Sequence, residues 1–352
     1  MMDIIQIQAM KGNTKRVESG TNKRCPDVYN SFPKEVRDAL NKFETFFRKS
    51  LFSDSPLLNE VIKYIFDRHG KKIRPACVFL SAMASAPSEP FINDKTFAGT
   101  AAIEMVHTAS IVHDDVVDRS DQRRGNKSVN AEWTSRIAVL AGDYLMAKAL
   151  VLITEYQMFD FMNIMSYPIA EMSVGEMIQI EKSIALDTTE EIYFEIIRKK
   201  TAVLIGASME VGAKSSGASH LAETMYRIGE NVGMAFQIKD DIFDYEKTNL
   251  LGKPTGNDVV ENKITLPLIY ALKQVDNKRQ KEILKCVKHS STDRKYISTV
   301  RDFVLENDGL TYATSVAEKY VEKAIDMISI LDDSPAKQSL ISLARYVTKR
   351  NE

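Results

Sequence analysis

Two aspartate clusters, each inside an apolar segment, constrain the fold of this chain more than any other feature of its sequence. The first reads DDVVD at 114–118 and the second DDIFD at 240–244. In a helix of 3.6 residues per turn, the first and last aspartates of each cluster project from one face. Either cluster alone is equally well a solvated acidic face. Two copies favour one site, shared by two distant helices and suited to a hard cation such as magnesium.

The composition favours helices over sheets. The 352 residues include only 15 glycines and 10 prolines, while 44% are hydrophobic. These proportions predict one large, mostly helical domain, and neither strand alternation nor a short repeat is evident. We expect a polar, loosely ordered leader at 1–30 and one domain at 31–352. Because 47 basic residues face 48 acidic ones, no nucleic-acid partner is expected.

The cysteines and the hydropathy pattern bear on location. Cys25, Cys77 and Cys286 are far apart and form no CxxC pair, so neither a disulfide framework nor a zinc site is predicted. No apolar run approaches the ~18 residues of a membrane span, and no secretory signal begins the chain. We therefore expect a cytoplasmic protein without a transmembrane segment.

Hydrophobic spacing predicts helices along most of the chain. The expected helices cover about 33–51, 57–67, 76–86, 96–118, 131–143, 165–182, 190–199, 206–212, 221–246 and 266–273, followed by amphipathic helices to the end. The sequence TTEE at 188–191 reads as a capping start. The small and apolar residues of 96–118 predict burial on most sides of that helix.

Cations follow each aspartate cluster. Arg123 and Arg124 follow the first, while Lys253 and Lys263 follow the second. Distant parts of the chain add further candidates, namely Lys71, Arg74 and Lys200. Arginine offers a planar fork and lysine a point charge for phosphate oxygens, so carboxylates alternating with cations suit a magnesium-bridged polyphosphate. Each cation taken singly is more simply explained as an exposed ion pair.

Seven motifs in a fixed order identify a family resemblance. They are GKKIRP at 70–75, EMVHTASIVHDDVVDRSDQRRG at 104–125, GDYL at 142–145, GEMIQ at 175–179, KTA at 200–202, FQIKDDIFD at 236–244 and GKPTGNDVVENKITLP at 252–267. With these motifs the chain resembles trans-isoprenyl diphosphate synthases, the polyprenyl synthetase family. The resemblance implies the all-α isoprenoid synthase fold, a single large bundle of long, mostly antiparallel helices around a central cavity, and usually a homodimer.

The resemblance also implies roles for single residues. Six aspartates are expected to hold three Mg2+ ions on an allylic diphosphate: Asp114, Asp115, Asp118, Asp240, Asp241 and Asp244. Four cations are expected around that diphosphate, the last of them close behind: Arg123, Lys200, Lys253 and Lys263. Five residues are expected to hold the diphosphate of isopentenyl diphosphate: Gly70, Lys71, Arg74, His107 and Arg124. Oxygen dipoles of Thr201 and Gln237 should face the carbocation, with Gln179 near the metals. His69 and Lys72 depart from the residues usual in the family.

The implied activity is condensation of isopentenyl diphosphate in trans with an allylic diphosphate such as farnesyl diphosphate. Magnesium and the cations would stabilise the diphosphate anion as the allylic carbon–oxygen bond breaks, so no protein nucleophile is needed. The product would be delivered to a membrane.

The residues just before the first cluster bear on product length. In the family, an aromatic residue four or five positions before the first aspartate blocks the cavity. Here Ser110 and Ala109 occupy these positions, and Val106, Met105 and Ala102 lie deeper on the same helix. We therefore expect a long, octaprenyl-like product for a quinone side chain. The other interpretation is that the small residues only permit close helix packing.

Three alternatives stay open. A shorter-chain enzyme, a farnesyl or geranylgeranyl diphosphate synthase, would differ mainly at the chain-length positions. A terpene cyclase would generally carry a different second metal motif in place of DDIFD. A non-catalytic regulatory subunit of a prenyl synthase would have lost aspartates from one cluster, and this chain has lost none.

Overall fold

The computed structural model describes residues 27–67, 71–86, 88–123, 125–246 and 256–350. Most of the leader expected at 1–30 lies outside these residues. Asp27–Ser31 form a 3-10 helix, η2, in which Tyr29 is buried and stacks on Phe32 with 4.8 Å between ring centroids. Packing of the domain therefore begins slightly before the expected boundary at 31.

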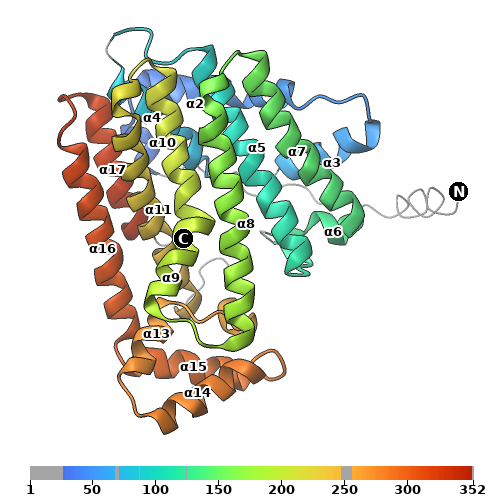
Figure 1. The fold of residues 1–352 in the computed structure, drawn as a ribbon, viewed down its shortest axis with the longest axis vertical. Coiled ribbons are helices and arrows are strands. Elements are labelled where there is room, and N and C mark those ends of the chain that lie inside the picture. The colour runs from blue at the N-terminus through green and yellow to red at the C-terminus, as the bar shows by residue number, and fades with distance from the viewer. Residues whose placement is uncertain (1–26, 68–70, 87, 124, 247–255, 351–352) are drawn as a thin grey trace, which may run out of the picture.

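The described chain is an all-α bundle, as expected (Figure 1). Its longer helices are α2 (Lys34–Ser50), α3 (Pro56–Phe66), α4 (Ile73–Ser85), α5 (Asp94–Val117), α7 (Ser135–Glu155), α8 (Met162–Ala185), α10 (Val203–Ser215), α11 (Ala222–Tyr245), α14 (Asn277–His289), α15 (Arg294–Glu306), α16 (Gly309–Ile328) and α17 (Pro335–Lys349). Shorter elements are α6 (Val129–Glu132), α9 (Glu190–Ile197), α12 (Asn257–Val260), α13 (Leu266–Lys273), the 3-10 turns η3 (Phe159–Phe161) and η5 (Ser219–Leu221), and the π-helical turn η4 (Arg198–Ala202).

Side-chain caps fix where several helices begin. Asn93 accepts a 3.1 Å hydrogen bond from the backbone N–H of Thr96, whose hydroxyl accepts one from the Asn93 N–H, and this capping box starts α5. Thr189 caps α9, as the sequence predicts. Thr134 caps α7, which begins later than expected because the preceding residues form the separate helix α6.

Helix α7 differs from expectation in a second respect. It continues to Glu155, well beyond the expected end at 143, and over this length it is apolar enough to cross a membrane. The expectation that no segment approaches a membrane span is therefore wrong on length and composition. One face of α7 packs on α5 within the bundle, as the core helix of a soluble protein also would.

A two-stranded hairpin interrupts the loop expected after the first aspartate cluster. Strand β1 (Gln122–Arg123) pairs antiparallel with β2 (Asn126–Lys127). Gly125, between the strands, has φ of 75°, a left-handed conformation that glycine adopts without strain. Strands of two residues are too short to show alternating hydrophobicity, so the sequence does not reveal them.

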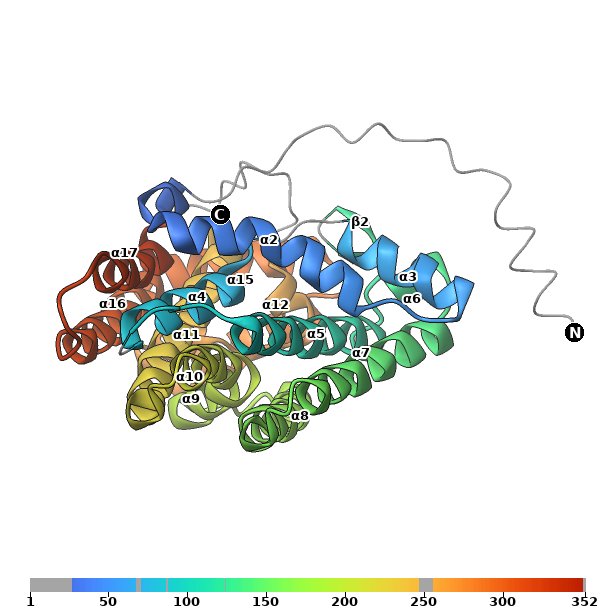
Figure 2. The ribbon, with the colours of Figure 1, turned by 90° about the horizontal axis from the view of Figure 1, so that it is seen from above.

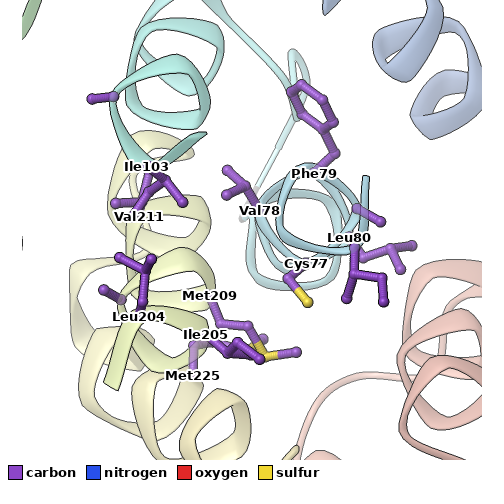
Figure 3. Packing of buried hydrophobic residues seen from close by; sticks show 14 of the residues in the cluster. Cys77, Val78, Phe79, Leu80, Ile103, Leu204, Ile205, Met209, Val211 and Met225 are labelled. Carbon is purple, nitrogen blue, oxygen red and sulfur yellow. The ribbon is translucent and has the colours of Figure 1, made fainter. Parts of the chain in front are cut away.

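The main core surrounds α4 and α10. In Figure 2, α4 and α5 lie between α2 on one side and α10 on the other. Figure 3 shows apolar side chains of α4, α5, α10 and α11 gathered together, among them Val78, Ile103 and Met209. At Gly212 a Cβ would lie 2.3 Å from the carbonyl oxygen of Val78, so α10 approaches α4 more closely than a side chain would allow. Because α10 also packs on α5 and α11, this core fixes the two helices that carry the aspartates.

Candidate active site

The first cluster lies at the C-terminal end of α5. Asp115 is 2% exposed and accepts two hydrogen bonds from Arg123, at 2.9 Å from Nε and 2.5 Å from Nη2. The hairpin thus holds Arg123 against the cluster. Asp114 and Asp118 are half-buried, and Asp118 is the C-terminal cap of the helix.

The second cluster lies at the C-terminal end of α11, and the surrounding protein engages two of its aspartates closely. Asp241 is buried and accepts hydrogen bonds from the Tyr193 hydroxyl, at 2.7 Å, and from Nε2 of Gln237, at 2.8 Å. Asp244 accepts from three successive backbone N–H groups, those of residues 256–258, at 3.1, 3.0 and 3.0 Å. It therefore caps α12, the helix that follows.

Asp240 has a different environment. Its side chain is 41% exposed, and its Oδ1 lies 2.6 Å from Nη2 of Arg350. The aspartates are therefore not equivalent. Three of them accept two or more hydrogen bonds from the protein, namely Asp115, Asp241 and Asp244. The spacing of the six aspartates in the sequence does not show which of them accept several hydrogen bonds from the protein.

The π-helical turn η4 carries Lys200 and Thr201 between α9 and α10. Lys199 pairs with Glu171 of α8 at 2.6 Å, and Lys200 forms an ion pair with Glu176 of the same helix. A π turn inserts an extra residue into the helix, and such turns are frequent at functional sites. The sequence predicts one helix to about 199 and the next from 206, whereas in the structure the π turn joins α9 to α10 without a break.

A hydrogen-bonded chain connects η4 to the second cluster. The Thr201 hydroxyl donates to Oε1 of Gln237 at 2.7 Å, Gln237 donates to Asp241, and Asp241 also accepts from Tyr193. Four side chains from α9, η4 and α11 are thereby held in fixed orientations. The sequence predicts Thr201 and Gln237 in one site, and the structure brings them together.

A cavity of about 110 Å³ lies beside this chain. Its lining includes expected site residues from separate segments: Gln179, Lys200, Thr201, Gln237, Asp241 and Lys263. Lys263 forms an ion pair with Glu261, and its Nζ lies 3.9 Å from Oδ2 of Asp118. The segment after α12 therefore connects the second cluster with the first.

Burial raises the pKa values of carboxylates in both clusters. Burial raises the pKa of Asp114 to about 6, against the lowering effect of the nearby Lys200. Burial also raises the pKa of Asp241, although the hydrogen bonds from Tyr193 and Gln237 oppose the shift. Buried carboxylates with raised pKa values favour the arrival of a cation, which stabilises their charged form.

The side chains present fit a magnesium ion shared with a substrate. Among the residues that the structure describes, no three acidic, histidine or cysteine side chains form a ready-made metal cage. Mg2+ usually binds one or two carboxylates and completes its shell with water and substrate phosphates. Asp114, Asp118 and Asp240 offer single carboxylates of this kind, because each keeps part of its surface accessible.

The residues expected at the second diphosphate come together in part. Nη1 of Arg74 on α4 donates to Nε2 of His107 on α5 at 2.8 Å. Tyr29 donates to the carbonyl oxygen of Lys71, just before α4. Lys72, one of the departures from the family, pairs with Glu44 at 2.6 Å. Four residues named from the sequence lie outside the described ranges: His69, Gly70, Arg124 and Lys253.

The expected chain-length residues lie in the main core. Met105, Val106 and Ala109 are fully buried there, as is Ala102. Ser110 is half-buried and donates to the carbonyl oxygen of His107 at 2.8 Å. The cavity described above does not reach these residues, and their effect on product length stays a prediction.

Three residues of the site are not predicted from the sequence: Glu176, Tyr193 and Arg350. Glu176 lies inside the GEMIQ motif, so the motif marks its position, although nothing marks its pairing with Lys200. Tyr193 and Arg350 contact aspartates 48 and 110 positions away in the chain. No local pattern indicates either residue, because only the packing of α9 and α17 brings them to α11.

Comparisons with known proteins identify similar sequences. The family model described as polyprenyl synthetase matches residues 55–304. The heptaprenyl diphosphate synthase component 2 of Bacillus subtilis is 34% identical, over 90% of this chain and 89% of the relative. The octaprenyl diphosphate synthase of Haemophilus influenzae is 35% identical, over 86% of this chain and 91% of the relative.

Solved structures share the fold. A decaprenyl diphosphate synthase from Rhodobacter capsulatus superposes with a TM-score of 0.83 at 31% identity, covering 90% of this chain and 97% of that one. A polyprenyl synthase from Caulobacter crescentus, complexed with calcium and isoprenyl diphosphate, gives a TM-score of 0.85 at 28% identity, covering 94% of this chain and 100% of that one. The likeness extends over nearly the whole described bundle.

Proposed function

This chain belongs to the polyprenyl synthetase family and is a long-chain trans-prenyltransferase, and from that premise we propose how its site works and what it makes. It condenses isopentenyl diphosphate with an allylic diphosphate such as farnesyl diphosphate. The observation that carries this proposal is the hydrogen-bonded chain from Thr201 through Gln237 to Asp241, next to Lys200 in one cavity. Oxygen dipoles, a cation and a buried carboxylate, all of which the reaction uses, therefore line the same space.

Asp114, Asp118 and Asp240 are the proposed holders of magnesium, because each of the other three aspartates accepts two or more hydrogen bonds from the protein. The complex of the Caulobacter protein with calcium and isoprenyl diphosphate supports a divalent ion. Three ions per site remain an expectation from the family. A magnesium ion held by these residues would supply positive charge that neutralises the diphosphate leaving group.

The protein's own cations orient the allylic diphosphate. Lys200 on η4 is held by Glu176, and Arg123 is fixed by Asp115 while its side chain stays 44% exposed. Lys253 is proposed to join them, with Lys263 close behind. Fixed positive groups of this kind stabilise charge on the leaving group without reorganising during the reaction.

Thr201 and Gln237 face the other product of ionisation, the allylic cation. Because the Thr201 hydroxyl donates its hydrogen to Gln237, the lone pairs of its oxygen remain for the electron-poor carbon. The double bond of isopentenyl diphosphate attacks this carbon, and the released diphosphate takes the surplus proton. Exclusion of water protects the cation meanwhile. The residues proposed to hold isopentenyl diphosphate are Gly70, Lys71, Arg74, His107 and Arg124.

The long product is proposed to be octaprenyl-like and destined for a quinone side chain. The relatives that support it include heptaprenyl and octaprenyl diphosphate synthases. The small residues Ala109 and Ser110 agree with a path that continues along α5. Geranylgeranyl diphosphate synthases also share the fold, for example one from Pyrococcus horikoshii with a TM-score of 0.82 at 26% identity. A shorter product is therefore the second candidate.

A second copy of the chain is the proposed cover for α7 and α8. Both helices expose large apolar side chains, among them Leu140, Val151, Val174 and Met177. A homodimer through this surface would cover the apolar residues of α7 that do not pack on α5. It would also account for the apolar character of α7, which by length and composition could cross a membrane. The cytoplasmic location stays an expectation.

The test is chromatography of the prenyl alcohols formed from farnesyl and isopentenyl diphosphates with magnesium. Long-chain alcohols are expected, and Asp114→Asn and Asp240→Asn should each lower kcat/KM by roughly a hundredfold or more. Asp332→Asn, in an exposed turn, is the matched control. Failure to incorporate isopentenyl units would favour a regulatory subunit. Cyclic hydrocarbon formed without isopentenyl diphosphate would indicate a cyclase.

A further inference from the structure

Helix α14 carries a row of four lysines on one face. Lys278, Lys281, Lys285 and Lys288 are spaced by three, four and three residues, which places them within one sector of a helix of 3.6 residues per turn. All four are exposed, whereas Ile283 and Val287 of the same helix are buried. We call these four residues the lysine row.

The lysine row is not neutralised by the rest of the described chain. None of its four residues has an acidic partner within ion-pair distance among the residues that the structure describes. The acid within α14, Glu282, pairs instead with Arg279 at 3.1 Å. Elsewhere lysines such as Lys199 and Lys273 do pair with glutamates. In a chain of net charge −1, the row is a local concentration of positive charge.

Like charges three and four residues apart on a helix repel each other. The row therefore gains stability when an anionic surface covers it. The four lysines extend over about 15 Å of helix, at 1.5 Å per residue. Lysines are mobile point charges on long stems, so a row of them suits a broad layer of negative charge better than one small ligand.

The position of α14 connects the lysine row with the active site. Figure 1 shows α14 and α15 together across the lower end of the bundle. Ser290, just after α14, donates to the carbonyl oxygen of Val259 in α12 at 2.7 Å, and α12 is the helix that Asp244 caps. Next to the row, the rings of His289 and the exposed Tyr296 are 6.1 Å apart. Tyrosine is a side chain that suits a boundary between water and lipid.

We propose that the lysine row rests on an anionic lipid bilayer, so that the molecule sits on the membrane surface by electrostatic attraction. The choice of lipid over another polyanion rests on the proposed function, because a long polyprenyl diphosphate is an amphiphile that has to leave for a bilayer. The aromatic pair is too small for deep insertion, so attachment is reversible and sensitive to salt.

The experiment sediments the full chain with vesicles of phosphatidylcholine, alone or mixed with phosphatidylglycerol, at low and high salt. The wild type is expected to bind only the anionic vesicles and to detach at high salt. The variant K278Q/K281Q/K285Q/K288Q should bind less tightly by about fivefold for each lysine removed. The corresponding four Lys→Arg substitutions should keep the binding.

A second variant controls for total charge. K42Q/K49Q/K95Q/K319Q removes the same charge from exposed lysines on α2, α5 and α16, and it should bind like the wild type. Equal binding to neutral and anionic vesicles, no binding, an equal loss in both glutamine variants, or binding to duplex DNA in preference to anionic vesicles would each overturn the proposal. Product formation measured in detergent needs no vesicle. It separates a failure of docking from a failure of the proposed catalysis.

Discussion

The guanidinium of Arg350 lies 2.6 Å from the carboxylate of Asp240, which connects the residue after α17 to the second aspartate cluster. Arg350 is buried, and its Cζ lies 4.0 Å from the centroid of the Phe236 ring. Its Nη2 also donates to the backbone carbonyl oxygen of Phe236 at 3.0 Å. Arg350 thereby orients a carboxylate proposed to bind magnesium. It also fastens α17 to α11.

Replacement of Arg350 should destabilise the protein through this junction. Arg350→Gln removes a hydrogen bond to Asp240 and two to backbone carbonyls, those of Phe236 and Val347, together with the stacking surface on Phe236. We expect the free energy of unfolding to fall by roughly 1–3 kcal/mol, as for other buried polar contacts. Thermal and denaturant unfolding measure this change. Arg345→Gln, on an exposed position of α17, should leave stability nearly unchanged, and an equal loss in both variants would contradict the assigned contact.

Tyr193 is expected to act on catalysis through Asp241. Tyr193→Phe removes the 2.7 Å hydrogen bond to Asp241, so Gln237 and Thr201 lose a fixed anchor. We expect kcat to fall by about tenfold, as when a hydrogen bond that orients the groups around a metal site is lost. KM for the allylic diphosphate should change little, because the cations that bind it are untouched. Steady-state kinetics in detergent separate the two constants.

Tyr296→Phe is the control for Tyr193→Phe, because Tyr296 is exposed on α15 and does not line the cavity. It should keep the wild-type kcat. If Tyr193→Phe also keeps the wild-type kcat, then Tyr193 has a structural role only and the hydrogen-bonded chain does not position Thr201.

The sequence predicts those parts of the molecule that depend on local patterns. Helices such as α5 and α11 follow from hydrophobic spacing, and the cap at Thr189 follows from the TTEE pattern. The hairpin of β1 and β2 and the π turn η4 do not follow from the sequence, since each is only a few residues long. Both of these elements carry expected diphosphate-binding cations.

The different environments of the six aspartates also cannot be predicted from the sequence. Within each cluster the residues look alike, and only tertiary contacts distinguish them. Asp244 caps α12, and Asp115 is held by an arginine on the hairpin. Gln237, one partner of Asp241, lies within the FQIKDDIFD motif. The other partner, Tyr193, and Arg350, the partner of Asp240, lie far away in the chain, so no motif indicates them.

The exposed apolar face of α7 and α8 leads to a prediction about assembly. Leu140→Glu places a charge on a side chain that is 57% exposed, so the folded monomer should tolerate it. If a second copy covers this face, burial of the charge without a partner should shift the chain from dimer to monomer. Light scattering after size-exclusion chromatography measures the mass.

The matched control for Leu140→Glu is Ile330→Glu, on another apolar side chain that is 64% exposed, between α16 and α17. It should leave the mass unchanged. A dimer that persists in Leu140→Glu would show that the contact between copies does not use this part of α7.

Product length should respond to Ala109, which is fully buried five residues before Asp114 on α5. Phenylalanine at this position needs space that the packed core does not offer without strain of about 1–3 kcal/mol. If the growing chain follows α5, the new ring enters that path, so Ala109→Phe should make shorter alcohols from farnesyl and isopentenyl diphosphates while the first condensation continues. Ala344→Phe introduces similar strain on α17, away from α5, and should keep the wild-type product. An unchanged product in a folded Ala109→Phe would show that this part of α5 does not measure chain length.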